Sequence, residues 1–486
     1  MDSFVIEGGS RLFGRTRING SKNAALPMLA TCLLTDQPVT LRDVPNLADI
    51  KNMLRLLGTL GVVRREGVEQ VEADAPYTDG VVTLHSVDPA ASHARYDIVK
   101  TMRASICTLG PMLAKRGYAR VSQPGGCAIG DRPIDLHLRG LQALGVQVTQ
   151  SEGDIIAKVP AGGLVGTTIF LGGNFGSTVL GTANVMCAAT LAKGVTIIES
   201  AACEPEIVDL ANLLNAMGAR VRGAGSPRLI IEGVSELSGT DHTVIPDRIE
   251  AGTLMIAAAI TNGDLILDNC PMDSLLAATY ALQTAGVHVT PLGQQAVAAA
   301  GGLATGHQRH KASLLSVITG SADPGAPTDR DDPMRRTVRI TCERFLKPVE
   351  VTTQPHPGFP TDIQAQLVAL LTLANGNSVV TERIFPDRFL HVAELLRMGA
   401  KINRVGSTVV INGVQRLKGA PVMASDLRAS AGLVLAGLAA EGTTIVNRVY
   451  HLDRGYERLE ERLRALGANV QRVDEKELAG AAVVEA

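Results

Sequence analysis

The sequence of 486 residues has no tryptophan and few other aromatic residues, with eight phenylalanines and six tyrosines. Glycine is abundant, with 50 residues, and 45% of the chain is hydrophobic. These proportions predict a core of small and branched aliphatic side chains in closely packed elements. Long apolar runs are also lacking, because stretches such as 251–260 and 433–440 are much shorter than the roughly 20 residues of a membrane-spanning helix. No basic segment followed by an apolar run opens the sequence, so we expect no secretory signal.

An excess of charge of either sign is absent too. Lys and Arg total 46 and Asp and Glu total 48, and the net charge of -2 argues against a non-specific nucleic-acid binder. The seven cysteines have no paired spacing, which favours a reducing compartment over a disulfide framework. No Cys/His cluster has the spacing of metal ligands. We therefore predict a soluble, cytoplasmic protein that uses no metal and no cofactor and binds neither nucleic acid nor membrane.

An internal repeat is the most informative pattern in the chain. Six amphipathic helical segments each end in a small or aliphatic residue and a glycine, and alternating residues typical of a strand follow. The six glycines are Gly61, Gly145, Gly218, Gly286, Gly399 and Gly467. A glycine at this place predicts a left-handed residue that closes the helix without a Cβ clash. Six mixed α/β units predict two pseudo-symmetric domains of three units each, and ligands prefer the cleft between domains.

One interval between these glycines is longer than the others. From Gly286 to Gly399 the chain contains about 40 extra residues, which fall near 294–336. That stretch is rich in Gly, Ala, His, Asp and Arg and has little apolar periodicity. We expect an exposed loop insertion there.

The first segment suited to chemistry lies near the N-terminus. Ser21, Lys22 and Asn23 precede a helical pattern, where an ammonium, an amide and free backbone N–H groups can hold an anion. The alternative is a surface lysine beside an N-cap serine, and the residues alone favour that alternative.

The second segment, 123–136, is a loop rich in glycine and proline that contains Cys127. Because Arg132 follows closely, the Cys127 thiol can act as an acid or a nucleophile. The alternative is a small buried hydrophobic residue, which is the usual state of a free cysteine. The residues leave both interpretations of Cys127 open.

The third segment, 355–366, has three prolines before a helical pattern that begins at Asp362. With Thr361 available as N-cap, Asp362 is interpreted as part of an ordinary helix start, since the helix dipole favours a carboxylate there. The sharper alternative is a general base on a loop at the domain edge. Taken alone, the residues favour the helix start.

Several arginines also lie in turn-like contexts. Each alone predicts a solvated or salt-bridged side chain, but together they can form a cradle for a multiply anionic substrate, because guanidinium groups match phosphate and carboxylate in bidentate fashion. These arginines are Arg103, Arg388, Arg428 and Arg454.

In this order the segments resemble the UDP-N-acetylglucosamine 1-carboxyvinyltransferases, a family of enolpyruvyl transferases. The resemblance covers nearly the whole chain, and the matching stretches are 21–25, 97–105, the Cys127 loop, 204–209, 246–250, the Asp362 segment, 426–430 and 450–457. It implies two inside-out α/β domains, each of three pseudo-symmetric repeats, with the active site in the cleft between them. We expect one domain over 22–245, with Cys127 on a lid loop, and the other over 1–21 plus 246–486, with the insertion.

The resemblance also implies an activity and a role for each residue. The chain would transfer the enolpyruvyl group of phosphoenolpyruvate to the 3-hydroxyl of UDP-N-acetylglucosamine and release phosphate, the first committed step of peptidoglycan precursor synthesis. Cys127 would donate a proton and react with the inhibitor fosfomycin, and Asp362 would take the proton of the hydroxyl. Phosphoenolpyruvate would be held by Lys22, Asn23, Arg132 and Arg454, with Arg428 in the same cradle. The residues expected to hold UDP-N-acetylglucosamine are Arg103, Arg132, Pro133, Ile134, Asp135, Leu136, Asp362 and the backbone of Ile384, and Arg388 is expected among the substrate-binding residues.

Enolpyruvyl-shikimate-phosphate synthase shares the fold but lacks the Cys127 loop, so we discount that activity. Two other functions stay open. In the stretch 173–180, where the family contacts the UDP moiety and often supplies a lysine, this chain has Gly176 and no cation. That departure leaves room for another uridine nucleotide, such as UMP, as acceptor. The other candidate is a catalytically inactive paralogue that senses UDP-sugar, but a sensor would need neither Cys127 nor Asp362.

Overall fold

The computed structural model describes residues 2–77, 79–123, 134–293, 332, 334–342 and 345–474. The chain divides into two compact units. We call Gly20–Ile245 the continuous unit, and Met1–Asn19 with Pro246–Ala486 the two-segment unit. Each unit has its own apolar core.

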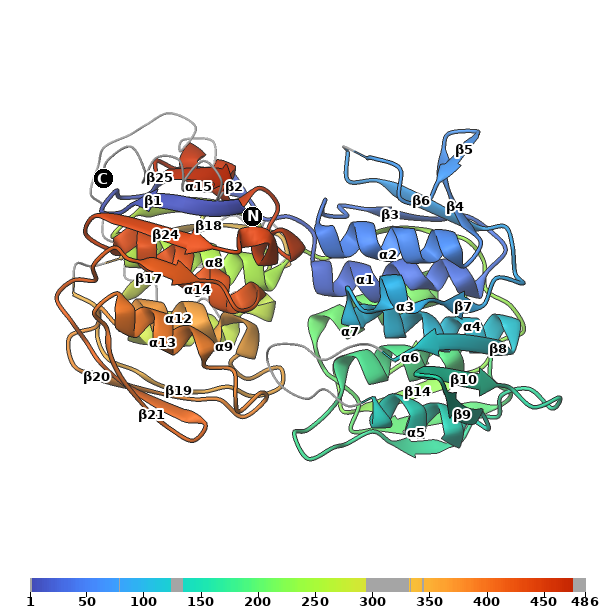
Figure 1. Cartoon of the computed structure of the whole chain (residues 1–486). Helices are drawn as coiled ribbons and strands as arrows, with labels where there is room; N and C mark the ends of the chain where they lie inside the picture. Colours follow the sequence, from blue (N-terminus) through green and yellow to red (C-terminus); the bar gives the residue numbers. More distant parts are fainter. Residues whose placement is uncertain are drawn as a thin grey trace. The chain divides into compact units, whose positions relative to one another are not determined.

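The continuous unit contains three sheets, in each of which consecutively named strands are hydrogen-bonded neighbours (Figure 1). The first consists of β15 (Asp241–Thr243), β3 (Val39–Arg42), β6 (Val82–Ser86), β4 (Val62–Glu66) and β5 (Glu69–Glu72). The second consists of β7 (His93–Ala94), β8 (Tyr118–Ser122), β10 (Asp154–Lys158) and β9 (Gln147–Ser151). The third consists of β11 (Thr168–Phe170), β12 (Val195–Glu199), β14 (Arg228–Glu232) and β13 (Arg220–Arg222). Its helical segments are α1 (Lys22–Ala30), η1 (Thr31–Leu34), α2 (Ala48–Thr59), α3 (Tyr96–Val99), η2 (Arg103–Thr108), α4 (Leu109–Arg116), α5 (Asp135–Ala143), α6 (Val179–Ala189) and α7 (Pro205–Ala216).

The two-segment unit repeats this plan with three further sheets. They are β23 (Pro421–Met423), β24 (Thr443–Asn447), β1 (Asp2–Glu7) and β25 (Asn469–Asp474); then β17 (Val287–Pro291), β18 (Arg336–Cys342), β16 (Asp264–Cys270) and β2 (Phe13–Arg17); then β19 (Glu350–Thr352), β20 (Asn377–Thr381), β22 (Thr408–Asn412) and β21 (Lys401–Val405). Its helical segments are α8 (Arg248–Ile260), η3 (Met272–Ser274), α9 (Leu276–Thr284), η4 (Thr361–Ile363), α12 (Gln364–Leu371), α13 (Leu390–Arg397), α14 (Leu427–Ala439), η5 (Val449–Arg454) and α15 (Leu459–Ala465).

All six sheets share one pairing pattern. In each sheet one edge strand runs parallel to its neighbour, as β19 does to β20, and the remaining neighbours are antiparallel. The same mixed pattern in six places shows that the chain is built from six copies of one α/β unit. The prediction of six such units is therefore confirmed.

The six predicted glycines end six helices as expected. We call these the outer helices, and they are α2, α5, α7, α9, α13 and α15. All six have positive φ values, from 77° at Gly61 to 102° at Gly218. Each follows the C-cap residue of its helix, so the left-handed conformation closes the last turn at the place where a side chain would be strained.

The inner helices of the two-segment unit, α8, α12 and α14, show why small residues are abundant in the sequence. In the two-segment unit α8, α12 and α14 pack against one another, and every residue of α8 and α12 is buried. A Cβ at Gly252 of α8 would lie 2.4 Å from Cδ1 of Ile363, and one at Gly432 of α14 would lie 2.8 Å from the carbonyl oxygen of Ala365. Glycine at these two positions lets the helices approach, with the sheets outside them (Figure 1).

The predicted insertion near 294–336 lies largely outside the described residues. The two strands that flank it, β17 and β18, pair antiparallel, with Pro291 opposite Val338. The backbone N–H of Leu292 then donates to the carbonyl of Thr337 at 2.9 Å. The extra residues therefore connect two adjacent strands of one hairpin.

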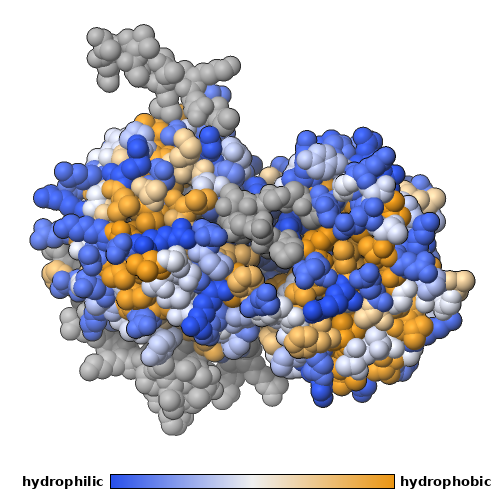
Figure 2. Space-filling view, turned by 60° about the horizontal axis from the view of Figure 1, so that its bottom comes forward, coloured by the Kyte–Doolittle hydropathy of each residue, from blue (hydrophilic) through white to orange (hydrophobic). Residues whose placement is uncertain are grey.

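Exposed apolar side chains are scattered over several strands and helices. Phe13 on β2, Phe170 on β11 and Tyr280 on α9 are examples, each more than half exposed. On the face shown in Figure 2, apolar areas are interrupted by hydrophilic residues. Scattered exposed apolar residues are normal in folded proteins. Within the described part of the chain, no helix has the length and apolar character needed to cross a membrane.

Candidate active site

Asp362 is held by two arginines at the start of an inner helix. It lies in η4, which leads into α12. Its Oδ1 accepts a hydrogen bond from Nη1 of Arg388 at 2.8 Å, and its Oδ2 accepts one from Nη2 of Arg428 at 3.1 Å. The side chains of Arg388 and Arg428 are 6% and 3% exposed, whereas that of Asp362 is 26% exposed. Two buried cations thus fix the orientation of a carboxylate that keeps an accessible surface.

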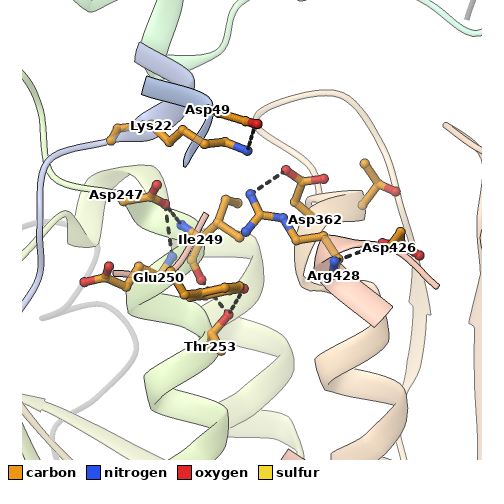
Figure 3. A network of polar contacts seen from close by, with 12 residues as sticks. Lys22, Asp49, Asp247, Ile249, Glu250, Thr253, Asp362, Asp426 and Arg428 are labelled. Atoms are coloured by element: carbon orange, nitrogen blue, oxygen red, sulfur yellow. Dashed lines mark hydrogen bonds and ion pairs between the residues drawn. The ribbon is translucent and has the colours of Figure 1, made fainter. Parts of the chain in front are cut away.

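The other two inner helices of this unit begin with an aspartate that caps them. Asp247 accepts hydrogen bonds from the second and third amides after it, at 2.8 and 3.0 Å, and so caps α8. Asp426 caps α14 in the same way, at 2.9 and 3.2 Å. Figure 3 shows both capping carboxylates, and it shows Asp362 reached by Arg428 instead.

The start of α12 differs from these two. Its N-cap positions are Pro360 for η4 and Ile363 for α12, and neither has a side chain that accepts a hydrogen bond. The expected N-cap role of Thr361 is wrong, because its hydroxyl donates to Oε2 of Glu382 at 2.8 Å. Among the three related helix starts, Asp362 is the one whose described partners are cations.

Arg428 lies over a buried polar cluster. The Tyr456 hydroxyl is 2.9 Å from Oγ1 of Thr253, and Nε2 of Gln366 donates to both of these oxygens at 3.1 and 3.0 Å. The guanidinium of Arg428 lies 5.5 Å from the centre of the Tyr456 ring. Burial by itself would lower the pKa of Arg428, but the nearby charges, first Asp362, raise it overall. Burial raises the pKa of Tyr456. Arg428 therefore stays cationic above a neutral tyrosine.

His391 on α13 lies beside the arginine cluster in neutral form. It is 1% exposed, and burial lowers its pKa to about 4. The charge of Asp426 opposes this shift and that of Arg388 adds to it. A neutral imidazole adds no competing cation next to Arg388.

Ile384 and Arg454 lie in the same unit as Asp362. The backbone N–H of Ile384 donates to Oε1 of the buried Glu382 at 2.7 Å, which fixes the backbone at that point. Arg454 is the last residue of η5 and is half-buried. After burial, the charge of Arg454 is the next cause that lowers the pKa of His451. Arg454 therefore lies within electrostatic reach of that imidazole.

In the continuous unit Lys22 is buried at the start of α1. Ser21 caps this helix, because its side chain accepts a hydrogen bond from the N–H of Ala24 at 3.3 Å. Nζ of Lys22 lies 3.2 Å from Oδ2 of Asp49, and both side chains are nearly inaccessible to solvent. The N-cap part of the surface-lysine interpretation holds, but a surface position for Lys22 is wrong. Asn23 follows on the same helix and is half-buried.

Two further predicted binding segments lie in this unit. Arg103 opens η2, which packs against α1, so it belongs to the same helical layer as Lys22. Ile134, Asp135 and Leu136 form the entry to α5. Cys127, Arg132 and Pro133 lie outside the described residues.

A buried asparagine connects these segments. On α6, Nδ2 of Asn184 donates to the carbonyl of Ile106 in η2 at 2.8 Å and lies 2.9 Å from Nδ1 of His137 in α5. Asn184 therefore fixes η2 and α5 relative to each other within the unit.

The structure thus brings together Asp362, Arg388 and Arg428 by direct contact. Sequence reasoning missed Glu382 and Tyr456, and it gave Thr361 only the role of a helix cap. A polar residue directly after a strand is a weak signal for Glu382, and nothing local distinguishes Tyr456 from other aromatic residues.

The fold and a family model define the class of protein. A model of EPSP synthase (3-phosphoshikimate 1-carboxyvinyltransferase) matches residues 6–463. The solved structure of the enolpyruvyl transferase NikO from Streptomyces tendae is 22% identical, with a TM-score of 0.77 over 97% of this chain and 99% of that chain. EPSP synthase from Acinetobacter baumannii is 18% identical, with a TM-score of 0.67 over 98% and 100%. At these identities the likeness concerns the fold, which is that of the carboxyvinyltransferases.

Curated relatives narrow the class. The UDP-N-acetylglucosamine 1-carboxyvinyltransferase of Methylacidiphilum infernorum is 47% identical over 98% of this chain and 100% of its own length. The enzymes of the same name from Magnetococcus marinus and Myxococcus xanthus are 46% and 47% identical, each over 97% of this chain and over 100% and 99% of their own lengths. The chain belongs to the UDP-N-acetylglucosamine 1-carboxyvinyltransferase family.

Proposed function

We propose that this chain transfers the enolpyruvyl group of phosphoenolpyruvate to the 3-hydroxyl of UDP-N-acetylglucosamine and releases phosphate. The observation that carries the proposal is the 47% identity with an enzyme of this name over 98% of the chain. The orientation of Asp362 by two buried arginines gives it independent chemical support. The reaction is the first committed step of peptidoglycan precursor synthesis.

The reaction proceeds by addition and elimination. Cys127 protonates C3 of phosphoenolpyruvate, and the sugar 3-hydroxyl adds to C2 while Asp362 takes its proton. The resulting tetrahedral ketal then loses a proton from C3 as the bond from C2 to the phosphate oxygen breaks. A base and an acid fixed in this way each lower the barrier by holding the proton where it is transferred. The proton lost from C3 restores the thiol of Cys127, and the hydroxyl proton taken by Asp362 leaves with the phosphate, so both residues return to their starting protonation states.

The cations stabilise the phosphate and carboxylate of the donor. Phosphoenolpyruvate is bound by the cations Lys22, Arg132 and Arg454 and by the amide of Asn23. Arg428 adds a fixed charge next to Asp362. Burial of Arg428 supports this role, because cations whose positions are already fixed stabilise developing negative charge at little cost in reorganisation.

The acceptor is held by a second group of residues. Arg103 and the run Arg132, Pro133, Ile134, Asp135 and Leu136 contact UDP-N-acetylglucosamine, together with Asp362 and the backbone of Ile384. Arg388 fixes Asp362 for this contact through its hydrogen bond of 2.8 Å.

The test is a phosphate-release assay with phosphoenolpyruvate and a panel of UDP-N-acetylglucosamine, other UDP-sugars and UMP. We expect turnover with UDP-N-acetylglucosamine and little with UMP. Turnover with UMP alone would identify a different uridine acceptor, and no turnover with binding of UDP-sugar would identify a sensor. The Asp387→Asn variant is a suitable control, since Asp387 is an exposed carboxylate that pairs with Arg404 on the surface.

We also propose that the protein works in the cytoplasm. The six cysteines of the described residues are free thiols. Four of them are buried, and three of these lie in the apolar cores. Free thiols without disulfides are typical of a reducing compartment.

A further inference from the structure

A buried carboxylate lies directly after β20. Glu382 has no exposed surface, yet its two oxygens accept four hydrogen bonds. Oε1 accepts from the Thr353 hydroxyl at 2.7 Å and from the backbone N–H groups of Ile384 and Phe385 at 2.7 and 3.0 Å. Oε2 accepts from the Thr361 hydroxyl at 2.8 Å. Burial of a charged group is costly unless hydrogen bonds replace its water, and here four donors do so.

This corner departs from the internal repeat. In each sheet the strand equivalent to β20 is the one that pairs with the parallel edge strand. In three other sheets the residue after this strand is left-handed: Asp43 after β3, Ser200 after β12 and Arg448 after β24, with φ values of 61°, 58° and 61°. None of the three is buried. Glu382 after β20 is not left-handed, and neither is Gln123 after β8. Gln123 is exposed, so burial is what distinguishes Glu382. Since the fold is built elsewhere without such a carboxylate, the departure indicates a local function.

Glu382 is linked to Asp362 through one hydroxyl group. Thr361 has a single O–H, which it donates to Glu382, so its oxygen accepts from Nη1 of Arg388 at 3.1 Å. The same Nη1 donates to Asp362 at 2.8 Å. The carboxylate of Glu382 thereby orients the Thr361 hydroxyl, so that a lone pair of its oxygen faces Nη1 of Arg388.

We infer that Glu382 is a positioning residue for the acceptor. It orients Asp362 through Thr361 and Arg388, and it fixes the backbone of Ile384 through a direct hydrogen bond. This inference rests on the proposed function, in which Asp362 and Ile384 contact UDP-N-acetylglucosamine. Its effect falls on the acceptor and the proton transfer rather than on the binding of phosphoenolpyruvate.

Replacement of Glu382 by Gln changes one hydrogen-bonding atom without changing the shape. Three donors converge on Oε1, so the amide oxygen takes that place and the amide nitrogen faces Thr361. The amide nitrogen is a donor, so the Thr361 oxygen must accept from it. The amide then competes with Arg388 for the lone pairs of that oxygen. The variant therefore reverses one hydrogen bond and leaves the packing unchanged.

The experiment compares Glu382→Gln, Thr361→Val and the double variant in steady-state phosphate release. We expect each single variant to lower kcat/KM for UDP-N-acetylglucosamine by about tenfold or more, with KM for phosphoenolpyruvate changed less than about twofold. The double variant should be no worse than the worse single variant, because both interrupt one linkage. Thr361→Ser keeps the hydroxyl and should retain activity. Glu441→Gln removes an exposed carboxylate of the same unit and serves as control.

A second measurement does not depend on turnover. Hydrogen exchange of the Ile384 and Phe385 amides should be faster in Glu382→Gln than in the wild type, because a neutral amide oxygen accepts their hydrogen bonds more weakly than a carboxylate does. It should be unchanged in Glu441→Gln. Unchanged exchange, additive kinetic losses in the double variant, or equal losses for both substrates with a lower Tm would each overturn the positioning role. A wild type that releases no phosphate would refute the proposed function. The exchange data would still test whether Glu382 fixes the backbone at Ile384.

Discussion

Arg428 and Asp362 form an ion pair between two repeats, with Nη2 of Arg428 3.1 Å from Oδ2 of Asp362. Arg428 belongs to α14 and Asp362 to the turn before α12, and these helices pack against each other. The carboxylate therefore depends on the packing of two inner helices for its orientation. A change in either helix start should affect the proton transfer that we assign to Asp362.

Replacement of Asp362 by Asn should lower kcat for phosphate release by about 10²–10⁴-fold, the usual contribution of a positioned base. The amide cannot take the proton, and it leaves Arg388 and Arg428 without their anionic partner. Thermal unfolding should therefore also occur at lower temperature. Near-normal turnover combined with a lower Tm would assign Asp362 a structural role only, and Asp387→Asn should change neither quantity.

Replacement of Tyr456 by Phe should destabilise the two-segment unit by about 1–2 kcal/mol, because it leaves buried hydrogen-bonding groups without their partner. The hydroxyl lies 2.9 Å from Oγ1 of Thr253 and 3.1 Å from Nε2 of Gln366. Denaturant unfolding measures the change. Tyr450→Phe is the matched control, since Tyr450 lies on η5 and is 46% exposed. An equal loss in both variants would show that the Tyr456 cluster contributes nothing particular.

Acid should destabilise the protein through His391. Its pKa in the folded state is lowered to about 4 by burial, from an unfolded value of 6.5. The unfolded chain therefore binds a proton between these values and the folded chain does not, so stability falls as the pH drops from about 6.5 to about 4. The contribution is on the order of 3 kcal/mol at most. The difference in Tm between the wild type and His391→Asn, followed from pH 8 to 4, should shrink over this window, and a constant difference would contradict the assignment.

Deletion of 295–331, with a short Gly/Ser turn in its place, should leave Tm and turnover nearly unchanged. The flanking strands β17 and β18 pair up to Pro291 and Val338, so a short turn spans the gap. The deletion keeps Asp332, whose carbonyl accepts from the N–H of Arg335, and Arg335, whose guanidinium donates to Asn269. Loss of solubility or activity would show that the insertion packs against the rest of the protein.

The repeats could be predicted from the sequence because they have a local signature. A glycine after an amphipathic helix requires no knowledge of distant residues, and all six such glycines are left-handed in the structure. The abundance of small residues also has a local cause, which Gly252 and Gly432 illustrate at helix crossings. Cys107 and Cys187 are buried for a local reason too, since both lie in apolar helical contexts.

The polar partners of Asp362 could not be predicted in this way. Arg388 and Arg428 are 26 and 66 residues away in sequence, and only the folding of α12, α14 and the loop before α13 brings them to one carboxylate. The local sequence predicted a helix N-cap at Thr361, but in the structure the Thr361 hydroxyl donates to Glu382. The burial of Lys22 against Asp49 depends likewise on the packing of α1 against α2.

The structure also makes a prediction about the thiols other than Cys127. Burial raises the pKa of Cys32 and Cys107 to about 12 and that of Cys187 and Cys270 above its ordinary value. Burial, together with the charge of Glu204, also raises the pKa of Cys203. A thiol must ionise to react, so these five cysteines should resist alkylation in the folded protein.

Cys127 should be the thiol that fosfomycin labels. Its loop is rich in glycine and proline, and Arg132 lies close to it in sequence, so a thiolate there is favoured over the buried thiols. Peptide mapping by mass spectrometry after treatment with fosfomycin and UDP-N-acetylglucosamine should find one adduct, on the peptide that contains Cys127. Cys127→Asp should give no adduct and keep part of the activity, because a carboxylic acid donates a proton but forms no thioether. Label on another cysteine, or full activity of Cys127→Ala, would remove Cys127 from the reaction.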